Sequence, residues 1–195
     1  MTTIRNTRDD VVRAAGRLFA DRGYHATSMR DLGKELGLHG SSLYSHITSK
    51  EALLVDVVMR GAELFEEVAN RALETDAAAV ERLRRLVVGH VDVVLDHLDE
   101  ARTFLNEARS LEPEHRATVV TARDRYEQAV RTIIGGGVES GEFAASVDPR
   151  MSSIYLLSIL NALDRWYRPE GDLDRLALVD SLMEFTLSAL GAAPQ

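Results

Sequence analysis

Residues 27–50 constrain the fold more than any other stretch of this chain, because two helical patterns follow each other there around a glycine. Apolar residues recur at helical spacing in both patterns: Met29, Leu32 and Leu36 in the first, and Leu43 and Ile47 in the second. Gly37 is expected to end the first helix in the left-handed conformation, which residues with side chains resist. The stretch therefore predicts two short helices that pack through narrow apolar stripes, a helix-turn-helix.

The outward face of the second helix is small and rich in hydroxyl groups. Its residues are Gly40, Ser41, Ser42, Tyr44, Ser45 and His46. Glycine and serine are poor helix-interior residues, so helix stability does not explain this face. Small side chains let a helix backbone approach a base edge, and hydroxyl and imidazole groups can hydrogen-bond phosphates or bases. We therefore interpret it as a DNA-reading face.

Residues 11–54 resemble the TetR family of bacterial transcriptional regulators. The positions that match the family pattern are Ala15, Leu18, Phe19, Gly23, Tyr24, Thr27, Leu32, Gly37, Leu38, Leu43, Tyr44, His46, Lys50, Glu51 and Leu54. The positions that depart from it are Gly33, His39, Ser41 and Ile47. With the helical periodicity of the remaining chain, the resemblance implies an all-α fold of about nine helices. It also implies a DNA-binding helix-turn-helix domain in residues 1–50 and a ligand-binding and dimerisation domain in residues 51–195.

The expected DNA contacts come from this head. They are Thr27, Ser28, Arg30, His39, Gly40, Ser41, Ser42, Tyr44, Ser45, His46 and Lys50. Phosphate contacts are expected from Thr27, Tyr44, His46 and Lys50, and base contacts from residues 39–42 and Ser45. Ser28 followed by Asp31 resembles a capping box, and the amides at such a helix start also suit a phosphate. The two heads of a dimer would enter successive major grooves of an inverted repeat, roughly 34 Å apart.

The formal net charge of −8 argues, taken alone, against a nucleic-acid binder, whose affinity depends on neutralising phosphates. The charge is unevenly spread, however. Residues 1–60 carry 9 Lys and Arg against 7 Asp and Glu, a net +2, and the remainder carries a net −10. The excess of positive charge thus lies in the expected DNA head. The acidic remainder of the chain would repel DNA and so favour one docking orientation.

Cysteine is absent, which excludes disulfides, thiolate metal sites and a cysteine nucleophile. The N-terminal segment lacks an apolar signal core, and no uncharged apolar run is long enough to span a membrane. A cytoplasmic protein without membrane contact is therefore expected.

Two C-terminal segments, residues 147–166 and 172–190, are apolar around most of their helical circumference and need partners on more than one side. A homodimer in which they meet their symmetry mates as a four-helix bundle is expected, since a palindrome-reading head also needs two copies. A buried pair inside a monomer is the alternative. Upstream, the glycines at 135–137 indicate either close packing or a bend in a long helix that begins at Pro113.

Residues 138–143 (VESGEF) and 165–171 (RWYRPEG) resemble TetR regulators of lipid, fatty-acid and steroid catabolism that respond to acyl-coenzyme A thioesters. That resemblance implies a cavity between the body helices with Arg165 and Trp166 near the effector. Arginine can pair with phosphates or carboxylates, and tryptophan can cover an acyl chain. The alternative is that Trp166 seals the dimer bundle and that Arg165 pairs with a neighbouring acid, Asp164 or Glu170. Further polar candidates are Arg102, Asn106, Arg123, Tyr126 and Asn161, although for each of them alone the pattern favours a satisfied core position or plain exposure over ligand contact.

Enzyme patterns are weak in this chain. A di-iron bundle needs paired Glu-x-x-His motifs, and Glu112 with His115 supplies one. His90 and His97 lie seven residues apart and are expected to be half-exposed beside aspartates rather than on a metal. No nucleophile triad, phosphate loop or dinucleotide-binding pattern occurs.

We therefore expect a non-enzymatic repressor, without a cofactor, that a small effector of the acyl-coenzyme A type releases from a palindromic operator. One alternative is a TetR-like regulator that senses another hydrophobic small molecule or no ligand. The other is a helical enzyme or interaction module that does not bind DNA.

Overall fold

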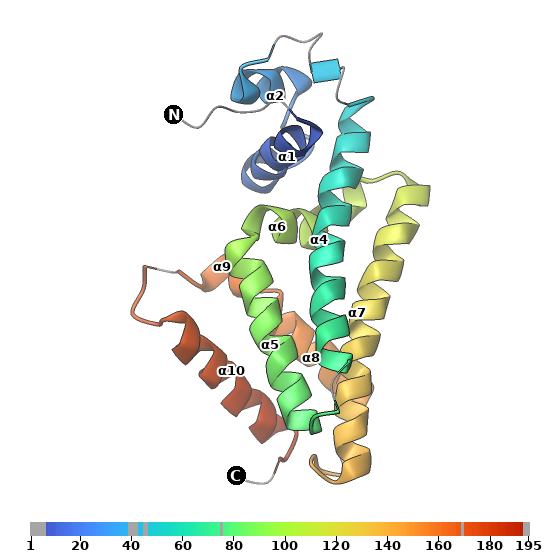
Figure 1. Cartoon of the computed structure of the whole chain (residues 1–195), viewed down its shortest axis with the longest axis vertical. Coiled ribbons are helices and arrows are strands. Elements are labelled where there is room, and N and C mark those ends of the chain that lie inside the picture. The colour runs from blue at the N-terminus through green and yellow to red at the C-terminus, as the bar shows by residue number, and fades with distance from the viewer. Residues whose placement is uncertain (1–6, 39–42, 45–46, 75, 169, 193–195) are drawn as a thin grey trace. The chain divides into compact units, whose positions relative to one another are not determined.

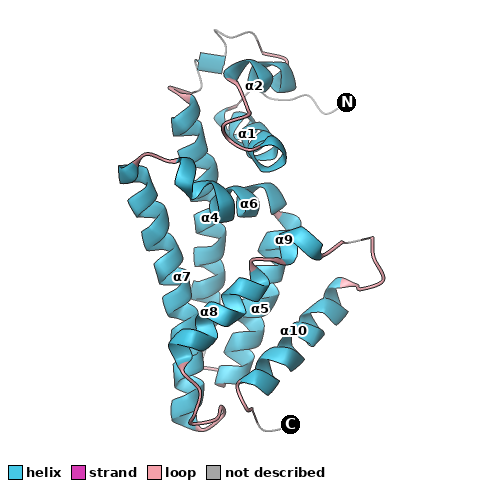
Figure 2. Cartoon of the chain, turned by 180° about the vertical axis from the view of Figure 1, so that it is seen from behind, coloured by secondary structure: helices cyan, strands magenta, loops and turns pink. Residues whose placement is uncertain are grey.

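The computed structural model describes residues 7–38, 43–44, 47–74, 76–168 and 170–192. Every regular element within these ranges is a helix, which confirms the predicted all-α fold (Figure 1 and Figure 2). The elements are α1 (Arg8–Arg22), α2 (Met29–Leu36), α4 (Lys50–Leu73), α5 (Ala79–Asp96), α6 (Leu98–Asn106), the short 3₁₀ helix η1 (Glu107–Ser110), α7 (Pro113–Ser140), α8 (Pro149–Leu160), α9 (Leu163–Trp166) and α10 (Arg175–Ala189). None of the described helices is both long and apolar enough to cross a lipid bilayer.

The chain divides into two compact units, each built from two separate stretches. Unit 1 contains Met1–Glu63 and His97–Thr121, and unit 2 contains Leu64–Asp96 and Ala122–Gln195. The helices α4 and α7 each contribute to both units. These units are defined by packing, whereas the boundary expected at residue 50 separates DNA-binding residues from ligand-binding and dimerisation residues. That functional boundary stays a prediction.

Unit 1 is organised around α1, which packs against α2 and α6 (Figure 1). A capping box of Thr7 and Asp10 begins α1, and Gly23 ends it with a φ of 83°. The apolar core includes Val11, Ala15, Leu18, Phe19, Leu32, Leu36, Leu43, Ile47, Leu53 and Leu54. The stripes predicted for both helices of the helix-turn-helix are thus confirmed at Leu32, Leu36, Leu43 and Ile47, which are all buried.

Close approach between α4 and α6 completes unit 1. A Cβ added at Gly61 would lie 2.7 Å from both the carbonyl oxygen of Glu100 and the Cβ of Phe104, so only glycine allows this separation. The side chain of Arg60 lies at the same crossing and contacts Glu100 through Nε at 3.8 Å and Asp9 of α1 through Nη1 at 2.7 Å. The helix α6 therefore belongs to the same packed body as the head helices.

Unit 2 is organised around α5, which contacts α8, α9 and α10 (Figure 2). Its core includes Leu83, Leu86, Val87, Val91, Val94, Val130, Ile133, Ile134, Leu160, Leu178 and Met183. The helix α7 continues through the three glycines at 135–137, and a Cβ added at Gly137 would overlap the ring of Phe143. Of the two explanations left open by the sequence, close packing accounts for Gly137.

The apolar segment after Pro149 is not the single helix to Trp166 that its pattern predicted. The helix α8 ends at Leu160, and the short helix α9 begins separately at Leu163. The N–H of Ala162 donates to the carbonyl of Ile159, three residues back, at 3.1 Å. This tighter turn interrupts the α-helical hydrogen-bond pattern before α9 begins.

Candidate DNA-binding and effector sites

The start and end of α2 are set by local hydrogen bonds. The hydroxyl of Ser28 accepts the N–H of Asp31 at 3.2 Å, and the carboxylate of Asp31 accepts the N–H of Ser28 at 2.9 Å. Hydrogen bonds from Ser28 lower the pKa of Asp31, so the carboxylate stays charged at the helix start. Gly37 ends α2 with a φ of 65°, in the left-handed region. The predicted capping box and glycine stop are both confirmed.

Thr27 requires a correction, because its side chain points into the head. It is 2 % exposed, and its hydroxyl donates to the carbonyls of Leu18 at 3.2 Å and Gly23 at 3.0 Å. Its N–H donates to the carbonyl of Tyr24 at 3.2 Å. Both donors are used inside the protein, so Thr27 stabilises the turn between α1 and α2 and is not the phosphate ligand that the sequence suggested.

The other described candidates in the head lie at its surface. Ser28 and Arg30 are exposed, and Tyr44 is a large aromatic side chain that is 57 % exposed. The remaining expected contacts lie outside the described residues: His39, Gly40, Ser41, Ser42, Ser45 and His46. DNA contact by the exposed residues stays a prediction.

Lys50, the first residue of α4, is held close to an aromatic ring. Its Nζ lies 4.1 Å from the ring centroid of Tyr24, in the turn between α1 and α2. Partial burial lowers the pKa of Lys50, and the carboxylate of Glu107 opposes this effect. Ser49 caps the helix by accepting the N–H of Ala52 at 3.0 Å, as expected. The ammonium group therefore lies against the face of the Tyr24 ring, at the start of α4.

A buried polar pair lies in unit 2. Nδ1 of His90 on α5 is 3.2 Å from the hydroxyl oxygen of Tyr126 on α7, and the ring of Phe65 on α4 packs against both, at centroid distances of 4.9 Å and 5.3 Å. His90 is 0 % exposed. This corrects the expectation that it is half-exposed, because its position falls on the inward face of α5.

Burial governs the ionisation of this pair. It lowers the pKa of His90 to about 3, an effect that the backbone carbonyl of Leu160 partly opposes, and it raises the pKa of Tyr126. Nε2 of His90 is buried and has no partner among the described residues that meets strict hydrogen-bond geometry, although the backbone carbonyl of Leu160 interacts with the ring and raises its pKa. At neutral pH the pair is therefore uncharged.

His90 and His97, which the sequence offered as a pair of metal ligands, differ in their exposure to solvent. His97, unlike His90, is exposed at the start of α6. No cluster of three or more His, Asp or Glu side chains suited to a metal ion occurs within the described ranges.

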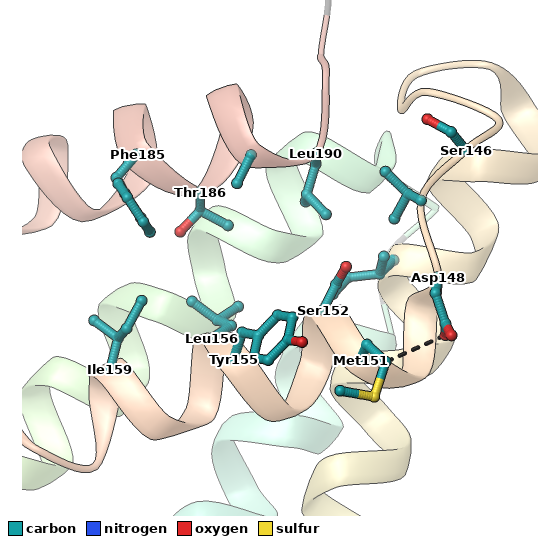
Figure 3. Close-up of a pocket in the computed structure, with 13 residues that line it drawn as sticks. Ser146, Asp148, Met151, Ser152, Tyr155, Leu156, Ile159, Phe185, Thr186 and Leu190 are labelled. Carbon is teal, nitrogen blue, oxygen red and sulfur yellow. Dashed lines mark hydrogen bonds between the residues drawn. The ribbon is translucent and has the colours of Figure 1, made fainter.

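An open cavity of about 330 Å³ is lined mainly by residues of α8 and α10, and Ile134 of α7 also lines it. Figure 3 shows Tyr155 and Phe185 facing this cavity from opposite helices. These two side chains are 61 % and 59 % exposed, and Leu176 of α10 is 69 % exposed. Met151 and Ile154 of α8 are also exposed, so both helices carry large apolar side chains at the surface, which we call the apolar face of α8 and α10.

Comparison with known proteins agrees with this architecture. Residues 76–190 match the tetracyclin repressor-like C-terminal domain, and residues 11–57 match the model for bacterial regulatory proteins of the tetR family. The chain belongs to the tetR family. It is therefore a DNA-binding transcriptional regulator, as the resemblance of residues 11–54 implied.

Two characterised tetR-family relatives match most of the chain. One is the transcriptional repressor KstR2 of Mycobacterium tuberculosis, 27 % identical over 173 residues that cover 87 % of this chain and 86 % of the relative. The other is the transcriptional activator FasR of Mycolicibacterium smegmatis, 26 % identical over 190 residues that cover 96 % and 84 %. Among solved structures, AibR in complex with isovaleryl coenzyme A and operator DNA superposes with a TM-score of 0.82 at 26 % identity, covering 94 % of this chain and 97 % of AibR.

The effector candidates expected in this tetR-family chain are distributed over both units. Arg102 and Asn106 lie on α6 in unit 1, where Nδ2 of Asn106 donates to the carbonyl of Arg102 at 3.0 Å. In unit 2, Tyr126 and Arg123 lie on α7, and half-buried Asn161 ends α8. Tyr126 is thus brought into the buried cluster with His90 and Phe65.

Arg165 and Trp166 lie at the surface of α9. Trp166 is 51 % exposed and contacts the ring of Tyr167 at a centroid distance of 6.3 Å. Nε of Arg165 is 3.9 Å from Oδ1 of Asp164, the neighbouring acid that the sequence named as its alternative partner. Their contact with an effector stays a prediction.

The sequence reasoning missed His90 and Phe65 as neighbours of Tyr126. A signal was present, since Leu83, Val87, His90 and Val94 recur at helical spacing and place His90 on the buried stripe of α5. The neighbourhood of Tyr126, by contrast, depends on how α5 and α7 pack, which spacing within one helix does not reveal.

Proposed function

We propose that this tetR-family protein is a homodimeric repressor that binds an inverted-repeat operator and leaves it when a small effector binds. The described part of the helix-turn-helix is the observation that carries the proposal: α2 has both its cap and its glycine stop, Tyr44 is 57 % exposed, and the Lys50 ammonium group lies over the ring of Tyr24. Repression is favoured by the likeness to KstR2. The likeness to the activator FasR makes activation the second candidate.

Dimerisation is supported by the apolar face of α8 and α10. Tyr155, Leu176 and Phe185 expose large apolar surfaces that a second copy of the chain would remove from water. Two α8–α10 pairs form a four-helix bundle when related by a twofold axis, and the same axis matches the symmetry of an inverted repeat.

An acyl-coenzyme A thioester is the effector class that we propose. The segments at 138–143 and 165–171 resemble regulators that respond to such thioesters, and AibR has been crystallised with isovaleryl coenzyme A and operator DNA. In unit 2 the neutral His90–Tyr126 pair lies among apolar side chains, so a thioester carbonyl or another uncharged polar group could accept or donate there. A different hydrophobic effector, or none, is the competing possibility.

The helix α4 provides a covalent route between the two activities. Lys50 at its start belongs to the DNA head, and Phe65, later in the same helix, belongs to the buried cluster. An effector that binds one conformation of this cluster more tightly would shift the population of conformations of the DNA heads. That shift would change the affinity for the operator. This role needs DNA access rather than catalysis, so we place the protein in the cytoplasm and assign it no enzymatic activity.

Gel retardation with the DNA upstream of its own gene tests the proposal. Purified protein is titrated with and without a panel of acyl-coenzyme A thioesters, with free coenzyme A and the matching fatty acids as controls. Release by one thioester but not by the controls is expected, and DNA retention with every thioester would contradict the effector class. A reporter gene on the same DNA then distinguishes repression from activation by the sign of its response to deletion of the regulator.

Variants separate the two candidate effector regions. Tyr126→Phe should raise the thioester concentration needed for release while leaving effector-free DNA binding unchanged, because the hydroxyl contacts His90 in unit 2 and is not one of the expected DNA contacts. Arg165→Ala with Trp166→Ala tests the surface of α9 in the same way. An unchanged response in both sets would favour an effector of different chemistry.

A further inference from the structure

Tyr24 is fixed on two sides in the turn between α1 and α2. Its ring packs edge-on against Phe19 of α1 at a centroid distance of 5.4 Å. Its N–H donates to Oε1 of Glu107 in η1 at 3.3 Å, and Oε2 of the same carboxylate accepts the hydroxyl of Ser110 at 2.9 Å. Both the backbone and the ring of Tyr24 therefore have defined positions within unit 1.

The face of this ring lies under the ammonium group of Lys50. The distance of 4.1 Å between Nζ and the ring centroid is well inside the roughly 6 Å limit at which the ring quadrupole attracts a cation. The start of a helix is otherwise an unfavourable place for a positive charge, because the helix dipole is positive there. The Tyr24 ring supplies an attraction that offsets this effect.

A lysine side chain is flexible and loses rotamer freedom when a phosphate captures its ammonium group. A ring that already restrains the ammonium reduces this loss, since less order is created on binding. We propose that Tyr24 is a positioning residue for operator binding, whose ring face holds the Lys50 ammonium group in place for a DNA phosphate. The inference rests on the DNA binding of the proposed function and is independent of its effector.

A purely structural role for Tyr24 is the competing explanation, because the ring also packs against Phe19. The test must therefore change the ring quadrupole without changing the packing. Tyr24→Phe keeps the ring face, and replacement of Tyr24 by pentafluorophenylalanine keeps nearly the same shape while removing the negative ring face. Each replacement is made in the wild-type chain and in a Lys50→Met background.

DNA affinity is measured by fluorescence anisotropy at several salt concentrations, on a duplex that the wild-type protein selects from a random pool. Lys50→Met should reduce the slope of log affinity against log salt by about 1, as expected for one lost phosphate contact. The fluorinated ring should bind DNA about two- to fivefold more weakly than Tyr24→Phe when Lys50 is present. It should match Tyr24→Phe when Lys50 is replaced.

Three results would overturn the inference: equal affinities for the two ring variants with Lys50 present, the same loss in both backgrounds, or an unchanged salt slope for Lys50→Met. Thermal unfolding of each variant shows whether packing has been preserved. The outcome is separable from that of the proposed function, because a protein that keeps the Tyr24 effect but ignores every thioester contradicts the proposed effector alone.

Discussion

Nδ1 of His90 lies 3.2 Å from the hydroxyl oxygen of Tyr126, and both side chains are buried in unit 2. Burial lowers the pKa of the imidazole to about 3 and raises the pKa of the phenol, so the hydrogen bond joins two neutral groups. A neutral pair in an apolar core binds uncharged polar groups better than ions, because a charge that is buried there loses its hydration.

Protein stability should fall with decreasing pH below 6.5 because of His90. The unfolded histidine takes up a proton near pH 6.5, whereas the folded one stays neutral down to about pH 3. The unfolded chain then binds more protons, so the free energy of unfolding contributed by His90 decreases by roughly 1.5–2 kcal/mol between pH 6.5 and 5. Urea unfolding at both pH values measures the decrease. His90→Leu should lack this part, and an equal decrease in that variant would contradict the assignment.

Tyr126→Phe should destabilise unit 2 by about 1–3 kcal/mol, because His90 loses its hydrogen-bond partner while it stays buried. The double variant His90→Leu with Tyr126→Phe should cost clearly less than the sum of the single variants, since no polar group is then left unpaired. Chemical denaturation of all four proteins completes the cycle. Additive costs would mean that the pair does not interact.

Thr27→Val should destabilise the head without altering its electrostatic contact with DNA. The substitution removes the hydroxyl that serves the carbonyls of Leu18 and Gly23, with an expected cost of about 1–3 kcal/mol. Thr27→Ser keeps the hydroxyl and is the matched control. The salt dependence of DNA affinity should be the same for all three proteins, and a slope lowered by about 1 in Thr27→Val would restore Thr27 as a phosphate ligand.

Two adjacent glycines of α7 should respond in opposite directions to alanine. A Cβ at Gly137 would overlap the ring of Phe143, whereas a Cβ at Gly136 meets nothing within 4 Å. Gly136→Ala should stabilise the protein by up to about 1 kcal/mol through helix propensity. Gly137→Ala should destabilise it by about 1–3 kcal/mol through overpacking. Thermal unfolding of the two variants checks the order, and a stabilised Gly137→Ala would show that the helix packing is looser than described.

Phe185→Glu should convert the dimer into a monomer and abolish tight operator binding. A carboxylate on the apolar face of α8 and α10 would have to be desolvated in a four-helix bundle, which is costly without a partner. Val120→Glu is the control, since Val120 is also an exposed apolar residue, at 45 %, but belongs to the unit 1 part of α7 rather than to α8 or α10. Light scattering gives the mass of each protein, and a dimeric Phe185→Glu would place the interface elsewhere.

Local features of the head were predictable from the sequence, because they depend on residues a few positions apart. Leu32 and Leu36 share one helix face through the 3.6-residue repeat. Ser28 and Asp31 form hydrogen bonds with each other across three positions, and Gly37 adopts the left-handed backbone conformation that ends α2. The same periodicity marked α8 and α10 as apolar over most of their circumference. Helix formation and the general fold class follow from such short-range chemistry.

Only the tertiary structure decided which polar side chains lie inside and which pairs meet. Thr27 resembles a surface phosphate ligand in sequence, yet the packing of α1 against α2 encloses it. Tyr24 and Lys50 are 26 positions apart, and His90 and Tyr126 are 36 apart. These contacts depend on how segments that are distant in the chain pack together. The same packing determines how deeply each side chain is buried, and burial in turn shifts its pKa. The sequence alone therefore determined the helices and their faces, whereas the packing of those faces determined the chemistry of the sites.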